Sequence, residues 1–554
     1  MHSLLILLIY YWLITFSLIG YGILFNRLFL GSSENDIGYV GFYGIFILTL
    51  FSYTSSFFIP HAEIFNSVVL LIGLINILIN RKKNIIKMNI KKILIIFFIL
   101  TIFILLAKNH DDFPYYHFPY TYLLTEYPNM VGLGNFNHGF RTHSSIFYLS
   151  SLFNLPYSNF FLLHLSPVFF MGFANIVLYN KILSHLNGKK PSYILYLSLL
   201  SFVFINVFFV RLGEHGTDRS AMILIIVIII ELFYLTNKNK IINKNSFLKL
   251  LIFITLIISL KTFYALYALL LIPVILYFNE NKVSLIFFFK NKITYLCLIM
   301  LLSVFSVNFL NSGCLLYPVK LTCFENFSWS IPISEVEQMN NWYQQWAKAG
   351  ANPNFRVENP EVYIKNFNWV SNWIDMYFFN KVSDFLMGLS FLCLVVWLTF
   401  FSKKITKSKK PKFWLLYLII IFLTVEWFYI LPTLRYGGYH LIALLLFIPL
   451  SIYLSKYSID TKLLKKKIYF IVFLTIVIFL SRNISRINKE YHAYNYNILN
   501  NAFYWDSQQS FKIANKIKKL NKCHIEKDLN SCSDYYIKVK FLNNSYIYYR
   551  GKNE

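Results

Sequence analysis

Runs of about twenty apolar residues dominate this chain and constrain what it can fold into. One run covers residues 3–25, and many more follow it. A helix of about 20 apolar residues spans the hydrocarbon core of a bilayer, whereas a soluble helix carries only an apolar stripe. Of the 554 residues, 57% are hydrophobic and only 14% are charged. The sequence therefore predicts an all-α, multi-pass integral membrane protein rather than a large soluble enzyme.

We expect about fourteen transmembrane helices of roughly 20 residues each. The first run is too long for a cleavable signal peptide and lacks an Ala-x-Ala cleavage site. We therefore expect it to remain as a transmembrane span. Two short runs that flank Lys261 favour a hairpin turning near that residue, with one long tilted helix as the alternative. The expected spans are 3–25, 38–58, 62–80, 92–108, 159–182, 193–210, 220–236, 247–260, 263–278, 284–309, 384–402, 412–431, 438–456 and 467–482.

The formal net charge of +27 would suit nucleic-acid binding, but the positions of the charges argue against it. Lys and Arg concentrate in short loops between apolar runs, which is the pattern of cytoplasmic loops in membrane proteins. We therefore expect membrane lipids, and no nucleic acid, among the partners. The basic loops lie at 81–92, 238–249, 403–412 and 462–467.

If the basic loops are cytoplasmic, most acidic residues face the other side, which we expect to be the periplasm of a bacterial inner membrane. The loop 211–219 and the turn 432–438 lie on that side as well. The chain then divides into N-terminal spans at 1–108, a first outer loop at 109–158, central spans at 159–309, a second outer loop at 310–383, C-terminal spans at 384–482 and a small α+β tail at 483–554.

Two close pairs of cysteines fall in these outer regions. Cys314 and Cys323 lie in the second loop, and Cys523 and Cys532 lie in the tail. An oxidising periplasm favours a disulfide in each pair, with free thiols as the alternative. The tail also predicts a helix near 510–520, followed by a hairpin of 536–542 and 545–549 with an Asn-Asn turn.

A pair of carboxylates, Asp111 and Asp112, stands where the fourth span would leave the bilayer. Asp112 suits a helix N-cap, with Pro114 in the first turn, and Pro119 should kink or end that short helix. A cap with a solvated charge is the plain interpretation. Two adjacent Asp in a chain this poor in charge point instead to a reaction site.

A Gly-rich segment follows at 132–145, and it carries His138, Arg141 and His143. Its glycines allow close approach of the backbone, and its donors suit a phosphate or a sugar. Its spacing fits neither a P-loop nor a dinucleotide-binding loop. A divalent metal is a lesser alternative, and its ligands would be His110, Asp111, Asp112 and His117.

This layout resembles the GT-C superfamily of polytopic glycosyltransferases, in which a membrane helix delivers Asp into the first large outer loop. Aromatic residues and His follow the Asp here, and a second long outer loop comes later. Residues 109–330 also resemble, more closely, a bacterial membrane-protein family of unknown function, through the segments 112–117, 132–135, 144–147 and 312–318. The superfamily resemblance implies inverting transfer of a sugar from a polyprenyl-phosphate donor to a periplasmic or lipid-linked glycan. The chain departs from the superfamily by placing the acidic loop after its fourth span.

Such a transfer needs a carboxylate to take the acceptor's proton and cations to hold the leaving phosphate. We expect Asp112 to be the base, because it stands in the Asp-x-x-x-Tyr-His pattern, and Asp111 to orient it. Lys261 is notable because an idle Lys within a long apolar stretch would be costly. The expected substrate- and phosphate-binding residues are Tyr116, His117, His138, Arg141, His143, Arg211, Lys261 and Arg435.

Each of these residues also has a plainer interpretation. The cations could be interfacial side chains that reach toward the head groups, and Glu214, His215 and Asp218 could form a solvated turn. Five Trp of the second outer loop suit either sugar stacking or interfacial anchoring: Trp329, Trp342, Trp346, Trp369 and Trp373. An O-antigen polymerase or ligase is the main rival function, and a transporter or flippase is the next.

Overall fold

The computed structural model describes most of the chain, and most of the described residues are helical. They are residues 2–32, 34–80, 84–105, 112–158, 162–186, 192–209, 216–237, 244–280, 286–352, 354–403, 405, 414–494, 507–526, 537–542 and 545–550. The fold is mainly α, as expected. A two-stranded sheet near the C-terminus supplies the small α+β extension.

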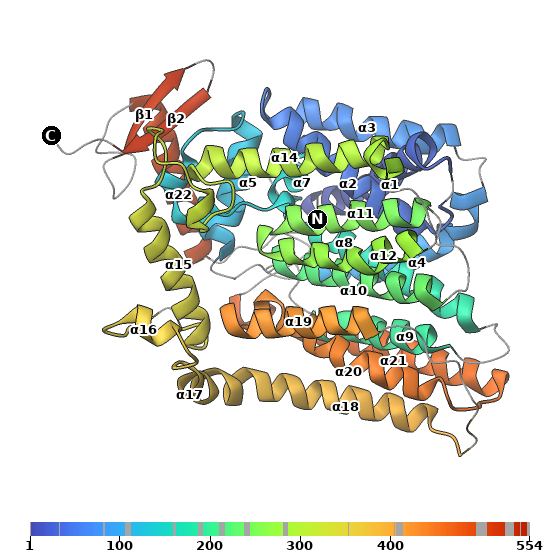
Figure 1. The fold of residues 1–554 in the computed structure, drawn as a ribbon. Helices are drawn as coiled ribbons and strands as arrows, with labels where there is room; N and C mark the ends of the chain where they lie inside the picture. The colour runs from blue at the N-terminus through green and yellow to red at the C-terminus, as the bar shows by residue number, and fades with distance from the viewer. Residues whose placement is uncertain are drawn as a thin grey trace.

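The helices run nearly parallel to one another in a broad bundle (Figure 1). The first half contains α1 (His2–Phe29), α2 (Ile37–Ser56), α3 (Glu63–Asn80), α4 (Asn84–Ile104), η1 (Phe113–His117), α5 (Phe118–Glu126), α6 (Leu133–Phe136), η2 (His138–Arg141), α7 (Ser145–Ser151), α8 (Ser166–Leu186), α9 (Tyr193–Phe208), α10 (Gly216–Asn237), α11 (Lys244–Leu260), η3 (Thr262–Leu271) and α12 (Ile272–Glu280). The second half contains α13 (Ile286–Phe289), α14 (Lys292–Ser312), η4 (Lys320–Thr322), α15 (Ile333–Lys348), α16 (Pro360–Ile364), α17 (Val370–Trp373), η5 (Ile374–Val382), α18 (Ser383–Phe400), α19 (Trp414–Ile430), η6 (Leu434–Tyr436), α20 (Gly438–Leu454), α21 (Thr461–Tyr494), α22 (Ser507–Glu526), β1 (Ile537–Leu542) and β2 (Ser545–Arg550).

Six helical segments are long and apolar enough to cross a membrane: 3–29, 37–56, 63–80, 166–186, 292–312 and 370–400. Shorter apolar helices accompany them, so fourteen spans are not confirmed for the described part of the chain. Several boundaries also differ from expectation: α4 begins at Asn84 rather than near residue 92, and α8 begins at Ser166 rather than near residue 159. The helix expected from residue 384 begins at Val370, because the π-helical η5 joins α17 to α18 without a break, and α21 continues to Tyr494 rather than ending near residue 482.

The hairpin expected at Lys261 is present. Lys261 adopts an extended backbone with φ of −159°, which ends α11 and redirects the chain into η3. The ring of Phe247 at the start of α11 lies 5.8 Å from that of Phe278 at the end of α12. The two arms are therefore antiparallel neighbours, and Lys261 stands at the tip between them.

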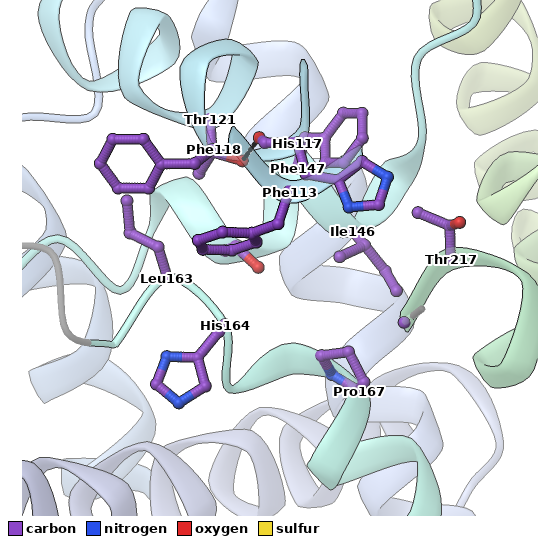
Figure 2. A pocket seen from close by; sticks show the side chains of 12 residues that line it. Phe113, His117, Phe118, Thr121, Ile146, Phe147, Leu163, His164, Pro167 and Thr217 are labelled. Carbon is purple, nitrogen blue, oxygen red and sulfur yellow. Dashed lines mark hydrogen bonds between the residues drawn. The ribbon is translucent and has the colours of Figure 1, made fainter. Parts of the chain in front are cut away.

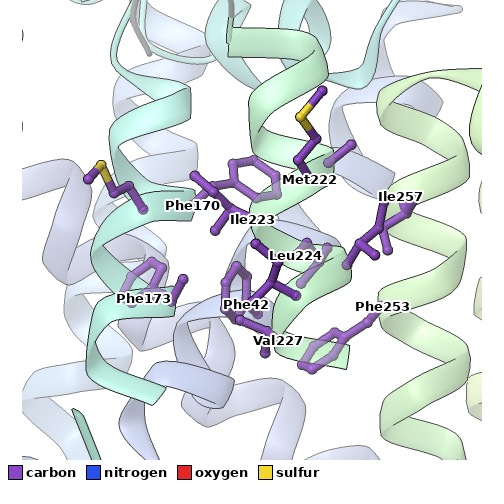
Figure 3. Close-up of a cluster of buried hydrophobic side chains, with 14 of the residues drawn as sticks. Phe42, Phe170, Phe173, Met222, Ile223, Leu224, Val227, Phe253 and Ile257 are labelled. Atoms are coloured by element: carbon purple, nitrogen blue, oxygen red, sulfur yellow. The ribbon is translucent and has the colours of Figure 1, made fainter. Parts of the chain in front are cut away.

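Large apolar side chains fill the centre of the bundle (Figure 3), where Phe42 of α2 meets Phe173 of α8 and Phe253 of α11. Close helix crossings elsewhere depend on glycine. A Cβ at Gly44 would lie 1.8 Å from the carbonyl oxygen of Leu18 on α1. Small residues at such crossings let helix backbones approach closely, which suits packing within a membrane. Any larger residue at Gly44 would force α1 and α2 apart.

One end of the bundle carries α15, α22 and the β-hairpin (Figure 1). β1 and β2 pair antiparallel with Leu542 opposite Ser545, which confirms the predicted hairpin, whereas its Asn-Asn turn lies outside the described residues. β2 also bonds to the first outer loop, because Tyr548 N donates to the Val131 carbonyl at 2.8 Å. The expected Cys314–Cys323 disulfide is present in the segment before α15, whereas Cys532 lies outside the described residues. We call this end the elaborated end.

Candidate functional site

Four charged side chains from four distant segments meet at the elaborated end. Arg435 donates from Nη2 to Asp112 Oδ2 at 2.5 Å and from Nε to Asp218 Oδ2 at 2.7 Å. Lys261 Nζ donates to the other oxygen of Asp218, Oδ1, at 2.5 Å. Asp218 thus holds both cations, and Arg435 holds both carboxylates. We call Asp112, Asp218, Lys261 and Arg435 the charged network.

Each member stands at an interruption in a helix. Asp112 directly precedes η1, and Asp218 lies in the first turn of α10. Lys261 lies at the turn between α11 and η3, and Arg435 lies in η6 between α19 and α20. Helix ends meet the aqueous boundary of a membrane bundle, so charges at these points can face one another outside the apolar core.

The prediction that Asp112 caps a helix is wrong. Its backbone is already helical, with φ of −65° and ψ of −28°, and its side chain caps no amide. The carboxylate instead pairs with Arg435. The short helix η1 ends at His117, just before Pro119, and Pro119 falls in the first turn of α5, where an amide N–H is not needed.

The network combines a buried anchor with three accessible groups. The Asp218 side chain is 1% exposed, whereas those of Asp112, Arg435 and Lys261 are 24–25% exposed. Burial alone would raise the pKa of Asp218, but Lys261 and Arg435 outweigh it and lower the pKa to about 2. Two negative and two positive charges balance, which is what a buried carboxylate requires.

Aromatic rings surround the cations. The ring of Tyr436 lies 4.6 Å from Lys261 Nζ and 5.9 Å from the guanidinium carbon of Arg435. Trp346 of α15 also packs against Tyr436, at 5.8 Å between ring centroids. Burial and the negative charge of Asp112 raise the pKa of the Tyr116 hydroxyl, so it stays protonated and can donate a hydrogen bond.

A small cavity adjoins the network (Figure 2) and is bounded by η1, residues 163–167 and the start of α10. His117 and Phe113 line it from one side, with Thr217, next to Asp218, on another. Its volume of about 30 Å³ suits one or two water molecules and excludes a sugar ring. A molecule as large as a sugar could therefore reach the network only from its exposed side.

Arg141 does not join the network, although the sequence analysis placed it with the phosphate-binding groups. It is 4% exposed and donates to Glu335 at 2.6 Å, to the Tyr317 hydroxyl at 3.1 Å and to the Gly134 carbonyl at 3.0 Å. Arg550 of β2 holds the other oxygen of Glu335 at 2.5 Å. This cluster joins both loops and the tail to one another.

The expected histidines also take separate positions. His138 stacks on Tyr343 of α15 at 5.9 Å, and burial together with the charge of Arg141 lowers its pKa to about 4. His143 is buried among Tyr53, Tyr120 and Tyr148, and burial lowers its pKa to about 3. Both imidazoles are neutral at pH 7, so neither supplies a positive charge for a phosphate.

Several expected residues lie outside the described residues: His110, Asp111, Arg211, Glu214 and His215. Among the residues that are described, no three His, Cys, Asp or Glu side chains group closely enough to hold a metal ion.

Asp218 is the member that sequence reasoning missed, since it was assigned to a solvated turn. It is fully buried and stands just before an apolar run. The argument that drew attention to Lys261 applies equally to it, because a charge beside apolar residues needs a partner. Pairing the isolated charges at span ends with one another would have linked Asp218 to Lys261.

The tail supports the segment that carries Asp112. Lys516 of α22 donates to the Tyr115 carbonyl at 2.5 Å, and its ammonium lies 4.1 Å from the Tyr115 ring. Ile513, one turn earlier on α22, is buried against Phe113 and Phe118. The C-terminal helix therefore packs directly on η1.

Replacing Lys516 with Ala should loosen η1. The Tyr115 carbonyl would lose the bond from Lys516 and keep the bond from Asn137, at 2.9 Å, so we expect amide exchange across residues 113–118 to accelerate about threefold. Hydrogen–deuterium exchange of the purified chain measures this. Lys518→Ala, on the exposed face of the same helix, is the control. Equal exchange rates in both variants would contradict the inference that Lys516 stabilises η1.

The family comparison covers most of the chain. Residues 4–442 match the family described as a domain of unknown function (DUF8201). The chain belongs to this family. The match contains every member of the charged network and ends before α21, α22 and the β-hairpin. No curated protein and no solved structure matches the chain.

Proposed function

We propose that the chain is a membrane glycosyltransferase that moves a sugar from a polyprenyl-phosphate donor to a periplasmic or lipid-linked glycan. The observation that carries this proposal is the contact of Asp112 with Arg435, beside Lys261. A carboxylate and two cations at one partly open site supply the proton acceptor and the phosphate ligands that such a transfer needs.

Asp112 is the proposed base. The acceptor oxygen attacks the anomeric carbon, and the hydroxyl proton passes to the Asp112 carboxylate. The bond from that carbon to the phosphate oxygen breaks, and its electron pair leaves with the phosphate. Arg435 holds Asp112 in position through their ion pair.

Lys261 and Arg435 are the proposed phosphate ligands. A guanidinium has five N–H donors, and the two contacts with Asp112 and Asp218 occupy Nε and Nη2. The buried Asp218 fixes both cations before substrate arrives, which reduces the ordering that binding requires. Tyr116 can donate to the same phosphate or to the sugar.

The proposed site is periplasmic and lies at the level of lipid head groups. The Lys-rich stretch 462–467, which the sequence predicts to be cytoplasmic, forms the first turns of α21 at the opposite side of the expected topology. Helices that are apolar enough to cross a membrane, such as α14 and α18, run from that side to the elaborated end (Figure 1). A polyprenyl phosphate within the bilayer would present its phosphate at this level.

Asp112→Asn tests the proposal. Removing the base should lower transfer by about 10² to 10⁴-fold, because that is the usual contribution of general base catalysis. The measurement is the surface-glycan profile of cells that carry the variant at wild-type protein levels. Asp384→Asn, at an exposed position of α18, is the matched control and should leave the glycan unchanged.

An unchanged glycan in Asp112→Asn would overturn the base assignment. A polymerase or ligase would give a different result, because it acts on a lipid pyrophosphate through Arg and His. Loss of glycan in His138→Ala, with a wild-type profile in Asp112→Asn, would favour that rival.

A further inference from the structure

Helix α15 crosses the elaborated end nearly perpendicular to the bundle (Figure 1). Val336 packs on its inner side with the disulfide segment of Cys314 and with Tyr317, which fixes the helix in place. Tyr343 lies next to the same cluster and stacks on His138. Helix α15 is therefore held in place over the elaborated end, and one of its faces points toward the ends of the bundle helices.

Two tryptophans stand four residues apart on α15, so they share one face. Trp346 contacts Tyr436, the residue that lies against Lys261 and Arg435. Trp342 lies further from the charged network, with its ring 6.4 Å from that of His138. Tyr436, Trp346 and Trp342 therefore form one aromatic surface that begins at the charged network.

Burial separates these two from Trp369 and Trp373 of the second loop. Trp369 is fully buried and Trp373 is 5% exposed, so both belong to the packed core with α19. Trp329 packs against Phe309 and Phe327. Trp342 and Trp346 are only partly buried, which leaves ring surface for a ligand.

We propose that Trp342 and Trp346 form a stacking platform for neutral sugar rings of the acceptor glycan. Aromatic faces bind the apolar C–H face of a sugar, and neighbouring polar groups bind its hydroxyls. Two successive rings suit a glycan chain, whereas the donor's phosphate requires the cations of the network. The choice of acceptor rests on the proposed function, but sugar binding at these rings can be measured independently of any transfer.

Saturation-transfer NMR on the purified full chain tests the platform, with disaccharides of glucose, galactose, mannose and N-acetylglucosamine as probes. We expect saturation of the C–H protons of at least one probe. Trp342→Ala and Trp346→Ala should each weaken its binding about tenfold, and Trp→Phe at the same positions should restore most of it. Trp414→Ala, at the exposed start of α19, should bind as the wild type does.

Two outcomes would overturn the platform. One is that no probe shows saturation, and the other is that both Ala variants bind as the wild type does. The Phe variants guard against misfolding, since they keep the ring and the packing. The NMR measurement contains no donor lipid, so a failure of the transfer proposal, seen in cells as an unchanged glycan in Asp112→Asn, is distinguishable from a failure of the platform.

Discussion

Glu231→Gln should destabilise the protein by about 3 to 5 kcal/mol, which is the usual result of breaking a buried ion pair. Glu231 lies in α10 and accepts from Lys181 at 2.6 Å and from Lys249 at 2.7 Å. The Tyr39 hydroxyl also donates to it, at 2.7 Å. These charged side chains are at most 10% exposed. Removing the carboxylate charge would leave two buried ammonium groups, of which Lys249 keeps its contact with Glu34 at 3.2 Å.

Glu337→Gln is the matched control for this experiment. Glu337 pairs with Lys320, but the two side chains are 49% and 55% exposed. Exposed pairs contribute at most about 1 kcal/mol, so the control should change stability little. Thermal unfolding in one detergent compares the two variants. Equal shifts in melting temperature would show that the Glu231 cluster does not hold α8, α10 and α11 together.

Arg435→Leu should cost about 3 kcal/mol, the lower end of the range for a broken buried pair. The substitution removes one of the two cations that hold the buried Asp218, and it removes the contact between Arg435 and Asp112. Arg435→Lys should recover only part of the stability, because one ammonium cannot span both carboxylates as the planar guanidinium does. Thermal unfolding measures the stability of each variant.

A double variant separates electrostatics from packing. Asp218→Asn in the Arg435→Leu background removes the stranded charge, so the double variant should be more stable than the sum of the two single losses predicts. Strict additivity would contradict the pairing between Asp218 and Arg435.

Glycan transfer should be lost in both Arg435→Leu and Arg435→Lys. A Lys ammonium cannot contact Asp112 and Asp218 at the same time as the two guanidinium nitrogens of Arg435 do.

Local pattern was enough for much of the fold. Apolar runs predicted most helices because a span is a contiguous stretch of sequence, and Lys261 marked a real turn between two of them. The Cys314–Cys323 disulfide and the tail hairpin could also be predicted from the sequence, since each joins residues close in the chain. The helix at Val370 was mistaken for loop because its first turns carry polar residues.

The sequence predicted only part of the candidate site. Asp112, Lys261 and Arg435 stood out as isolated charges at span ends, and the structure brings them together. Arg141 stood out for the same reason, yet it pairs with Glu335, nearly two hundred residues away. Sequence spacing cannot distinguish these cases, because both pairings depend on how distant helices are arranged.

The sequence by itself determined a membrane-type helical chain with its scarce acids at helix ends, because hydropathy and charge are properties of single segments. Only the tertiary structure decided that Asp112 meets Arg435 across 323 positions and that Asp218 lies buried between two cations. The physical reason is that a charge beside apolar residues needs an opposite charge, while the packing of α10, α11 and α20 determines which one lies within reach.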